Sequence, residues 1–132
     1  MDIKELFNYK NWVVIGSTTK PDKFAYKVSK VLNASNFNVA DVYPTDKTGK
    51  AYKSLEEVPF KPDCVDLCIN AKFGIDFVKK AKEMGIDKFL IQPGAESEEI
   101  LNYCKENNLT AIEGCALVQA KQLFGVDHKT LI

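Results

Sequence analysis

The sequence lacks the residues on which many catalytic and metal sites depend. It contains one histidine, His128, in the C-terminal segment GVDHKTLI, and no Ser/His/Asp set can be assembled around a sheet. Its four cysteines do not form the two close pairs that zinc sites use. Cys64 and Cys68 lie in one apolar run and are expected to share a face as buried packing residues. We therefore expect no metal site, and we assign no catalytic residue.

Net charge and long apolar runs are absent as well. The 18 basic and 18 acidic residues cancel at pH 7, so no overall field draws in DNA, RNA or an anionic membrane. No run of about eighteen apolar residues is present, and the first segment, MDIKELFNYK, carries charges where a signal peptide would be apolar. Without a signal peptide, the cysteines are expected to stay reduced. These features predict a cytoplasmic protein that binds neither nucleic acid nor membranes.

Length and patterning predict one α/β domain. At 132 residues with 45% hydrophobic residues, the chain can bury one sizeable core but is short for two domains. Apolar runs at 12–16, 37–43, 64–70, 88–92 and 109–114 are separated by segments that suit helices, and further helices are expected at 2–9 and 116–124. Ser97 suits a helix N-cap, and Gly85 suits the end of a helix. We expect a doubly wound, mostly parallel five-stranded sheet with helices on both faces, a Rossmann-like domain over residues 1–132.

Polar residues and glycines follow each predicted strand. Ligands of an open parallel sheet bind at the carboxyl ends of the strands, near the point where strand order reverses. Glycines, hydroxyls and helix N-termini let backbone N–H groups approach phosphate, and lysines add positive charge. We therefore predict a site for a phosphorylated ligand, built from these residues: Gly16, Ser17, Thr18, Lys23, Tyr43, Pro44, Thr45, Lys47, Asn70, Ala71, Phe73, Gln92, Pro93 and Gly94.

The stretch GSTTKPD after the first strand does not match the usual nucleotide fingerprints. The dinucleotide pattern G-x-G-x-x-G requires glycines where Thr18 and Pro21 stand. Its acidic partner, about 20 positions on, would be Asp46, which comes late and is followed by Lys47. The P-loop spelling is absent too. The residues disfavour NAD without excluding it, so a small NAD(P)-dependent oxidoreductase or another nucleotide-binding enzyme at the same sheet edge stays open as an alternative.

The order and spacing of these motifs resemble the CoA-binding domain family, a Rossmann-type family related to the N-terminal domain of the succinyl-CoA synthetase α subunit. The resemblance covers about residues 10–121 and rests on VVIGSTTKPDKFAYKV, VYPTD, YKSLEEVP, LIQPGAESEE and IEGCALV. It implies CoA or acyl-CoA as the ligand. It does not imply ligase activity, because the phosphorylated histidine of the synthetase belongs to a part that has no counterpart here.

The resemblance also implies a role for individual residues. The resemblance implies that the pyrophosphate of CoA lies at Gly16, Ser17 and Thr18, with Lys23 and Tyr26 closing over it. It implies that the adenosine lies beside Tyr43, Pro44 and Thr45, with Lys47 at the 3′-phosphate. The adenine and pantetheine path would then be lined by Asn70, Ala71 and Phe73, and its far end would approach Gln92, Pro93 and Gly94. Binding without turnover implies a stand-alone carrier, sensor or regulatory module. A third possibility is an assembly role, in which the apolar segment LFGVDHKTLI docks in a homodimer or on an unknown protein partner.

Overall fold

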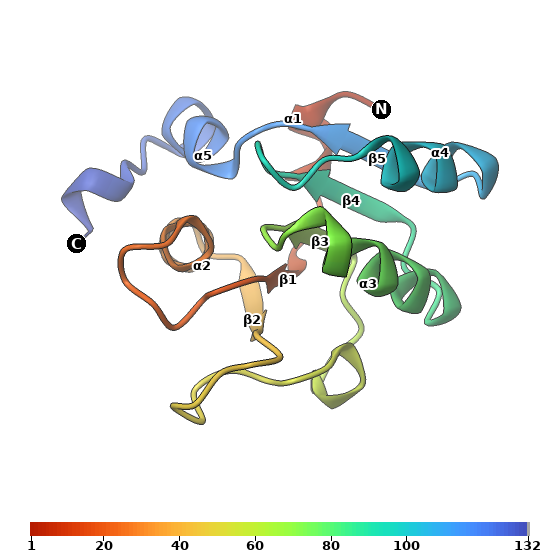
Figure 1. Ribbon diagram of the computed structural model, residues 1–132. Coiled ribbons are helices and arrows are strands. Elements are labelled where there is room, and N and C mark those ends of the chain that lie inside the picture. Colours follow the sequence, from red (N-terminus) through yellow and green to blue (C-terminus); the bar gives the residue numbers. More distant parts are fainter. Residues whose placement is uncertain (132) are drawn as a thin grey trace.

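A five-stranded parallel sheet forms the centre of the protein. The computed structural model describes residues 1–131 (Figure 1). The sheet has the order β2-β1-β3-β4-β5, and every neighbouring pair is parallel. Its strands are β1 (Asn11–Ile15), β2 (Asn38–Val42), β3 (Cys64–Leu67), β4 (Lys88–Ile91) and β5 (Thr110–Glu113). The predicted doubly wound α/β fold is confirmed, and Ile132, the last residue of the predicted docking segment, lies outside the described residues.

Helices cover both faces of this sheet. They are α1 (Ile3–Leu6), α2 (Phe24–Ala34), α3 (Ala71–Glu83), α4 (Glu98–Glu106) and α5 (Ala116–Phe124), with the 3-10 turns η1 (Leu55–Glu57) and η2 (His128–Thr130). Figure 1 shows α2 and α5 on one face and α3 and α4 on the other. Because β2 joins one side of β1 while β3 to β5 join the other, crossovers of one hand place α2 and α3 on opposite faces. No helix in residues 1–131 is long and apolar enough to cross a bilayer.

The two faces of the sheet bury two separate hydrophobic clusters. Successive side chains of a strand point to opposite faces, so Val13 and Ile15 pack toward α3 and α4, whereas Trp12 and Val14 pack toward α2 and α5. All four side chains are fully buried. Burial on both faces explains why the run WVVI is apolar without alternation.

The helix ends follow the predicted chemistry. Ser97 is the N-cap of α4, and its hydroxyl accepts a hydrogen bond from the Ile100 amide at 3.1 Å. Gly85 follows α3 with φ of 83°, a left-handed conformation that glycine adopts easily. Two predicted elements are shorter than expected. The first helix is one turn, and β3 ends at Leu67 because Asn70 caps α3 by accepting a hydrogen bond from the Lys72 amide at 2.9 Å.

Candidate functional site

A cleft of about 600 Å³ opens at the carboxyl ends of β1 and β3. These neighbouring strands form the topological switch point of the sheet, because β1 leads to β2 on one side and β3 leads to β4 on the other. Their loops diverge to opposite faces and leave a crevice between them. The cleft is lined by Gly16, Ser17, Tyr43, Pro44, Thr45, Lys53, Ser54, Cys68, Ile69, Asn70, Phe73, Asp76 and Phe77.

Gly16 allows the loop after β1 to lie against β3. Its φ is 152°, and a Cβ there would stand 2.8 Å from the Cys68 carbonyl oxygen and 3.0 Å from the Ala25 Cβ. The amide of Gly16 donates to the Val42 carbonyl at 3.0 Å, and its own carbonyl accepts from the Thr18 amide at 2.8 Å. A side chain at this position would displace the backbone at Cys68, just after β3, so only glycine fits here.

A second, polar pocket of about 410 Å³ adjoins the cleft and shares Tyr43 and Thr45 with it. Lys20 and Lys47 line this pocket, and the Lys20 Nζ lies 6.0 Å from the centre of the Tyr43 ring. Hydrogen bonding to Ser17 above all, and then to Thr45 and Lys20, lowers the pKa of Tyr43. Two lysines beside several hydroxyls make this pocket suitable for an anion.

Asp46 also lines the polar pocket, but its carboxylate is already occupied. It accepts hydrogen bonds from the Thr19 and Thr48 hydroxyls, each at 2.8 Å, and from the amides of Thr48 at 3.1 Å and Ala51 at 3.2 Å. Burial raises the pKa of this carboxyl, but the hydrogen bonds outweigh burial and hold its pKa well below the usual value. Asp46 therefore holds its own loop together, ties it to the loop after β1 through Thr19, and is not available to bind the ribose hydroxyls of NAD.

The structure brings together predicted residues from the loops after the first three strands. Lys47 lines the polar pocket. The main cleft collects the following predicted residues: Gly16, Ser17, Tyr43, Pro44, Thr45, Asn70 and Phe73.

Other predicted residues of these loops lie outside both cavities. Thr18 is 3% exposed, and its hydroxyl has no hydrogen-bond partner within residues 1–131. Lys23 is the exposed N-cap of α2. Tyr26 lies in α2 with the Lys30 Nζ 5.2 Å from its ring centre, and Ala71 begins α3. Their predicted contacts with a ligand stay predictions.

The loop after β4 also lies outside the cavities, since β4 is separated from β1 by β3. Gln92 is 2% exposed, and its side-chain oxygen accepts a hydrogen bond from the Ala116 amide at 2.8 Å. Pro93 and Gly94 are exposed. In this structure Gln92 caps the start of α5 through this hydrogen bond. Its predicted role at the far end of a ligand stays a prediction.

Some cleft residues were outside the predicted set. Asp76 and Phe77 follow Phe73 by three and four positions on α3, so helical spacing could have indicated them. Lys53 and Ser54 reach the cleft because a parallel bridge between Val42 and Tyr52 brings the polar segment back to β2, and no local pattern signals this pairing. Cys68 and Ile69 were missed because the apolar run reads as strand through residue 70.

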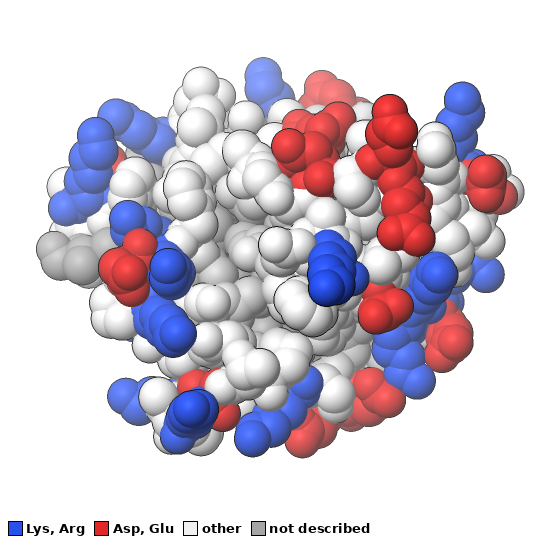
Figure 2. All heavy atoms as spheres, in the orientation of Figure 1, with Lys and Arg blue, Asp and Glu red and all other residues white. Residues whose placement is uncertain are grey.

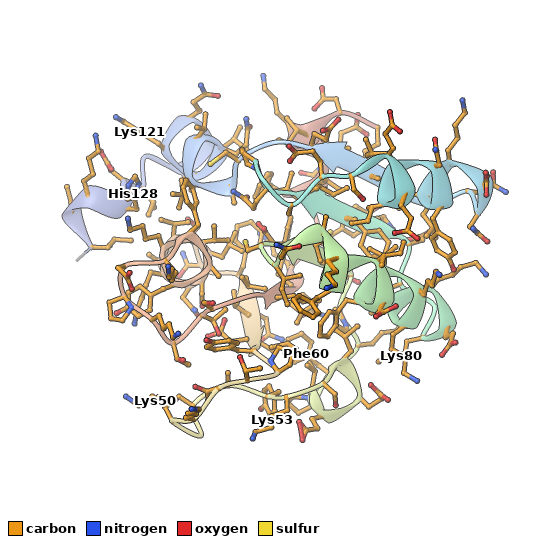
Figure 3. The ribbon with its side chains drawn as sticks, in the orientation of Figure 1. Lys50, Lys53, Phe60, Lys80, Lys121 and His128 are labelled. Atoms are coloured by element: carbon orange, nitrogen blue, oxygen red, sulfur yellow. The ribbon has the colours of Figure 1, made fainter. Side chains whose placement is uncertain are left out.

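Most charged side chains lie away from the middle of the face that Figure 2 shows. The ends of β1 and β3 lie near the middle of Figure 1, and the same region of Figure 2 is mostly white with one blue side chain projecting over it, while further lysines lie to the left and below and carboxylates gather over α4. Lys50 and Lys53 project from the segment between β2 and β3. Figure 3 shows His128 well away from them, beside α5, where its Nδ1 lies 3.8 Å from an Asp127 oxygen. His128 therefore does not belong to the cleft.

Fold and cleft together define a Rossmann-like α/β domain with an open cleft at its switch point. Comparison with known protein families identifies the family within this fold. The family model of the CoA binding domain matches residues 10–121, which is most of the chain. The chain therefore belongs to the CoA-binding domain family, and the resemblance inferred from its motifs is confirmed.

Known relatives include a ligase subunit and proteins without a described function. The chain is 29% identical over 96 residues to the α subunit of an ADP-forming acetate–CoA ligase of Pyrococcus furiosus, and it spans only 21% of that subunit. It is 28% identical to the uncharacterized protein YneT of Bacillus subtilis, with 84% of this chain and 85% of YneT covered. A solved structure of a conserved hypothetical protein from Pyrococcus furiosus matches with a TM-score of 0.76 and 30% identity, covering 84% of this chain and 99% of that one.

Proposed function

We propose that the chain binds CoA or acyl-CoA in the main cleft and acts as a non-catalytic carrier, sensor or regulatory module. One observation carries this proposal: an open cleft at the switch point is joined, through Tyr43 and Thr45, to a polar pocket that bears two lysines. CoA combines an adenine base with a pyrophosphate and a separate 3′-phosphate. Such a ligand needs an apolar slot and more than one place for negative charge.

The start of α2 suits the pyrophosphate. Its N-cap, Lys23, makes no side-chain cap hydrogen bond, so the first amides of this 11-residue helix are open to an anion. Because Gly16 has no side chain, its backbone lies close to Ala25 in the first turn of this helix and to the backbone at Cys68. Ser17 adds a half-buried hydroxyl at the cleft wall. Backbone N–H groups, a positive helix end and a nearby lysine are the donors that bind phosphate in doubly wound folds.

The remaining parts of CoA suit the two cavities. Phe73 lines the cleft with 55% of its surface exposed, and a planar base lying against it would cover that apolar area. Phe77 and Pro44 provide further apolar walls. The 3′-phosphate suits the adjoining pocket, where Lys20 and Lys47 lie among threonine hydroxyls.

The alternative, a small NAD(P)-dependent oxidoreductase, is less well supported. NAD binding uses a free carboxylate after β2 to hold the ribose hydroxyls. Asp46 follows β2, but its carboxylate already accepts hydrogen bonds from Thr19, Thr48 and Ala51. Ligase activity is not proposed, since the chain spans about a fifth of the matching ligase subunit.

Calorimetric titration tests the proposal directly. CoA, acetyl-CoA, dephospho-CoA, ATP and NAD are titrated separately into the purified chain at constant salt. We expect CoA to bind about tenfold more tightly than dephospho-CoA, which is about 1.4 kcal/mol for one phosphate contact. Binding of NAD without any heat from CoA would overturn the proposal. Equal affinities for CoA and dephospho-CoA would remove the role of the polar pocket.

A further inference from the structure

We propose that Asp66 is a positioning residue that makes ligand binding in the main cleft depend on the protonation of a buried carboxyl group. This inference rests on the proposed function. Asp66 lies in the central strand β3 and is fully buried, with 0% of its surface exposed. Its register partners are Val14 of β1 and Leu90 of β4, both apolar and fully buried. A carboxyl group in the middle of such a sheet contributes nothing to apolar packing, so it calls for another explanation.

Burial and a shortage of hydrogen-bond donors favour the neutral form of Asp66. One oxygen, Oδ1, accepts from the Cys68 Sγ at 3.2 Å, and a thiol is a weak donor. The other oxygen, Oδ2, has no partner within residues 1–131. Burial raises the pKa of Asp66 to about 7, although the contact with Cys68 opposes the shift. An ionised Asp66 would be a nearly unsolvated charge.

No cation neutralises Asp66 from the packed elements of residues 1–131. The thiols of Cys64, at the start of β3, and Cys68, just after it, flank Asp66, and burial raises the pKa of both. Cys115, which precedes α5, is a third thiol packed against this face, and α1 and α2 contribute apolar side chains. Lys88 at the start of β4 pairs with Asp87 at 2.9 Å. Asp41 of β2 lies beyond Val14 in the same row, and burial raises its pKa despite Ser29 and Lys30.

Cys68 connects Asp66 to the cleft. It lines the cleft directly, and its amide donates to the Ile15 carbonyl at 2.8 Å. Its carbonyl oxygen stands 2.8 Å from the place that a Cβ of Gly16 would take. Asp66, Cys68 and Gly16 therefore form one chain of contacts beneath the proposed pyrophosphate site.

This arrangement couples binding to proton uptake. Phosphates held at Gly16 and Ser17 bring negative charge toward Asp66 and disfavour its ionised form further. The pKa of Asp66 should then be higher in the complex than in the free chain, so binding takes up a proton. Affinity should be highest when Asp66 is protonated and should fall as the pH rises through its titration. A pKa difference of one unit between the two states corresponds to a tenfold loss, so we expect about tenfold between about pH 6 and pH 8.5.

The test compares CoA affinity across this pH range in wild type, Asp66→Asn and Asp76→Asn. Asp76 is an exposed carboxylate of the same cleft and serves as the matched control, and titration of the CoA phosphates is common to all three proteins. We expect the wild type and Asp76→Asn to lose about tenfold more affinity than Asp66→Asn. Calorimetry in buffers of different ionisation heats should show proton uptake that Asp66→Asn lacks. Equal pH slopes in wild type and Asp66→Asn would overturn the coupling.

A second measurement needs no variant. The infrared C=O stretch of a protonated carboxyl can be followed in the wild type from about pH 5 to pH 9, with and without CoA, which has no carboxyl group of its own. We expect a titration near neutral pH whose midpoint rises on CoA binding, and an unmoved midpoint would contradict the coupling. If CoA binds but the midpoint and slopes do not differ, only the coupling fails. If CoA does not bind the wild type, the proposed function fails and takes the coupling with it.

Discussion

The loops after β1 and β3 and the loops after β4 and β5 occupy equivalent ends of parallel strands, and the main cleft opens at the first pair. Between β1 and β3 the chain turns to opposite faces, and side chains line an opening of about 600 Å³. After β4 and β5 the corresponding space is filled, because Gln92 bonds to the Ala116 amide and Ile3 packs where a side chain of Gly114 would lie. Position at the carboxyl edge is therefore not sufficient for a site, and the reversal of strand order decides where it opens.

The largest effect is expected at the first pair of loops, from Gly16→Val. The branched side chain would meet the Cys68 carbonyl at 2.8 Å in a backbone conformation with φ of 152°. We expect CoA affinity to fall by at least about a thousandfold, which is about 4 kcal/mol, and the free energy of unfolding to fall as well. Calorimetry and urea unfolding measure the two effects.

Gly125→Ala is the control for this change. Gly125 also has a left-handed φ, 68°, but an added Cβ there would meet nothing within 4 Å. We expect a stability loss of about 1 kcal/mol from backbone strain and unchanged CoA affinity. A Gly16→Val protein that binds CoA like this control would remove Gly16 from the site.

Asp66→Asn should change how the free energy of unfolding depends on pH. The pKa of Asp66 in the folded chain, about 7, lies above its ordinary value of 3.8, so folding favours the protonated form. This stabilisation is complete below the pKa of Asp66 in the unfolded chain, and it is lost as the pH rises through the pKa of about 7 in the folded chain. We expect the wild type to lose about 3 kcal/mol more than Asp66→Asn between about pH 5 and pH 8, at 1.36 kcal/mol for each pKa unit. Urea unfolding at both pH values measures this, and parallel pH profiles would contradict it.

Lys47→Ala tests the polar pocket beside the cleft. Removing one of its two lysines should lower CoA affinity about tenfold, or about 1.4 kcal/mol, while affinity for dephospho-CoA stays constant. Lys50→Ala is the matched control, because this exposed lysine of the same segment lines neither cavity. If both variants lose affinity equally, the effect is one of general charge and not of the pocket.

Gln92→Leu tests the loops after β4 and β5, and its effect on CoA affinity should be the smallest of these changes. The change removes the acceptor of the Ala116 amide at the start of α5, so we expect the free energy of unfolding to fall by about 1 kcal/mol. The loss of CoA affinity should be smaller than that of Lys47→Ala. A larger loss would show that the ligand extends to the loop after β4, as the family resemblance implies.

Much of the fold could be predicted because its signals are local. Apolar runs mark the five strands, and Ser97 and Gly85 mark helix ends that the structure confirms. The end of β3 was harder, since Cys68 and Ile69 continue the apolar run although Asn70 already caps α3. For the site, the loops after β1 to β3 were identified, but Lys53 and Ser54 depend on a pairing between Val42 and Tyr52 that only the folded chain reveals.

The most direct test of the central claim is an amide NMR titration of the ¹⁵N-labelled chain with CoA at about pH 6. CoA in the main cleft predicts the largest shift changes at Gly16, Ser17 and Asn70, with smaller changes at Thr45 and little change in α4. Amides that do not move on addition of excess CoA, or shift changes confined to α4 and the residues after α5, would contradict the account.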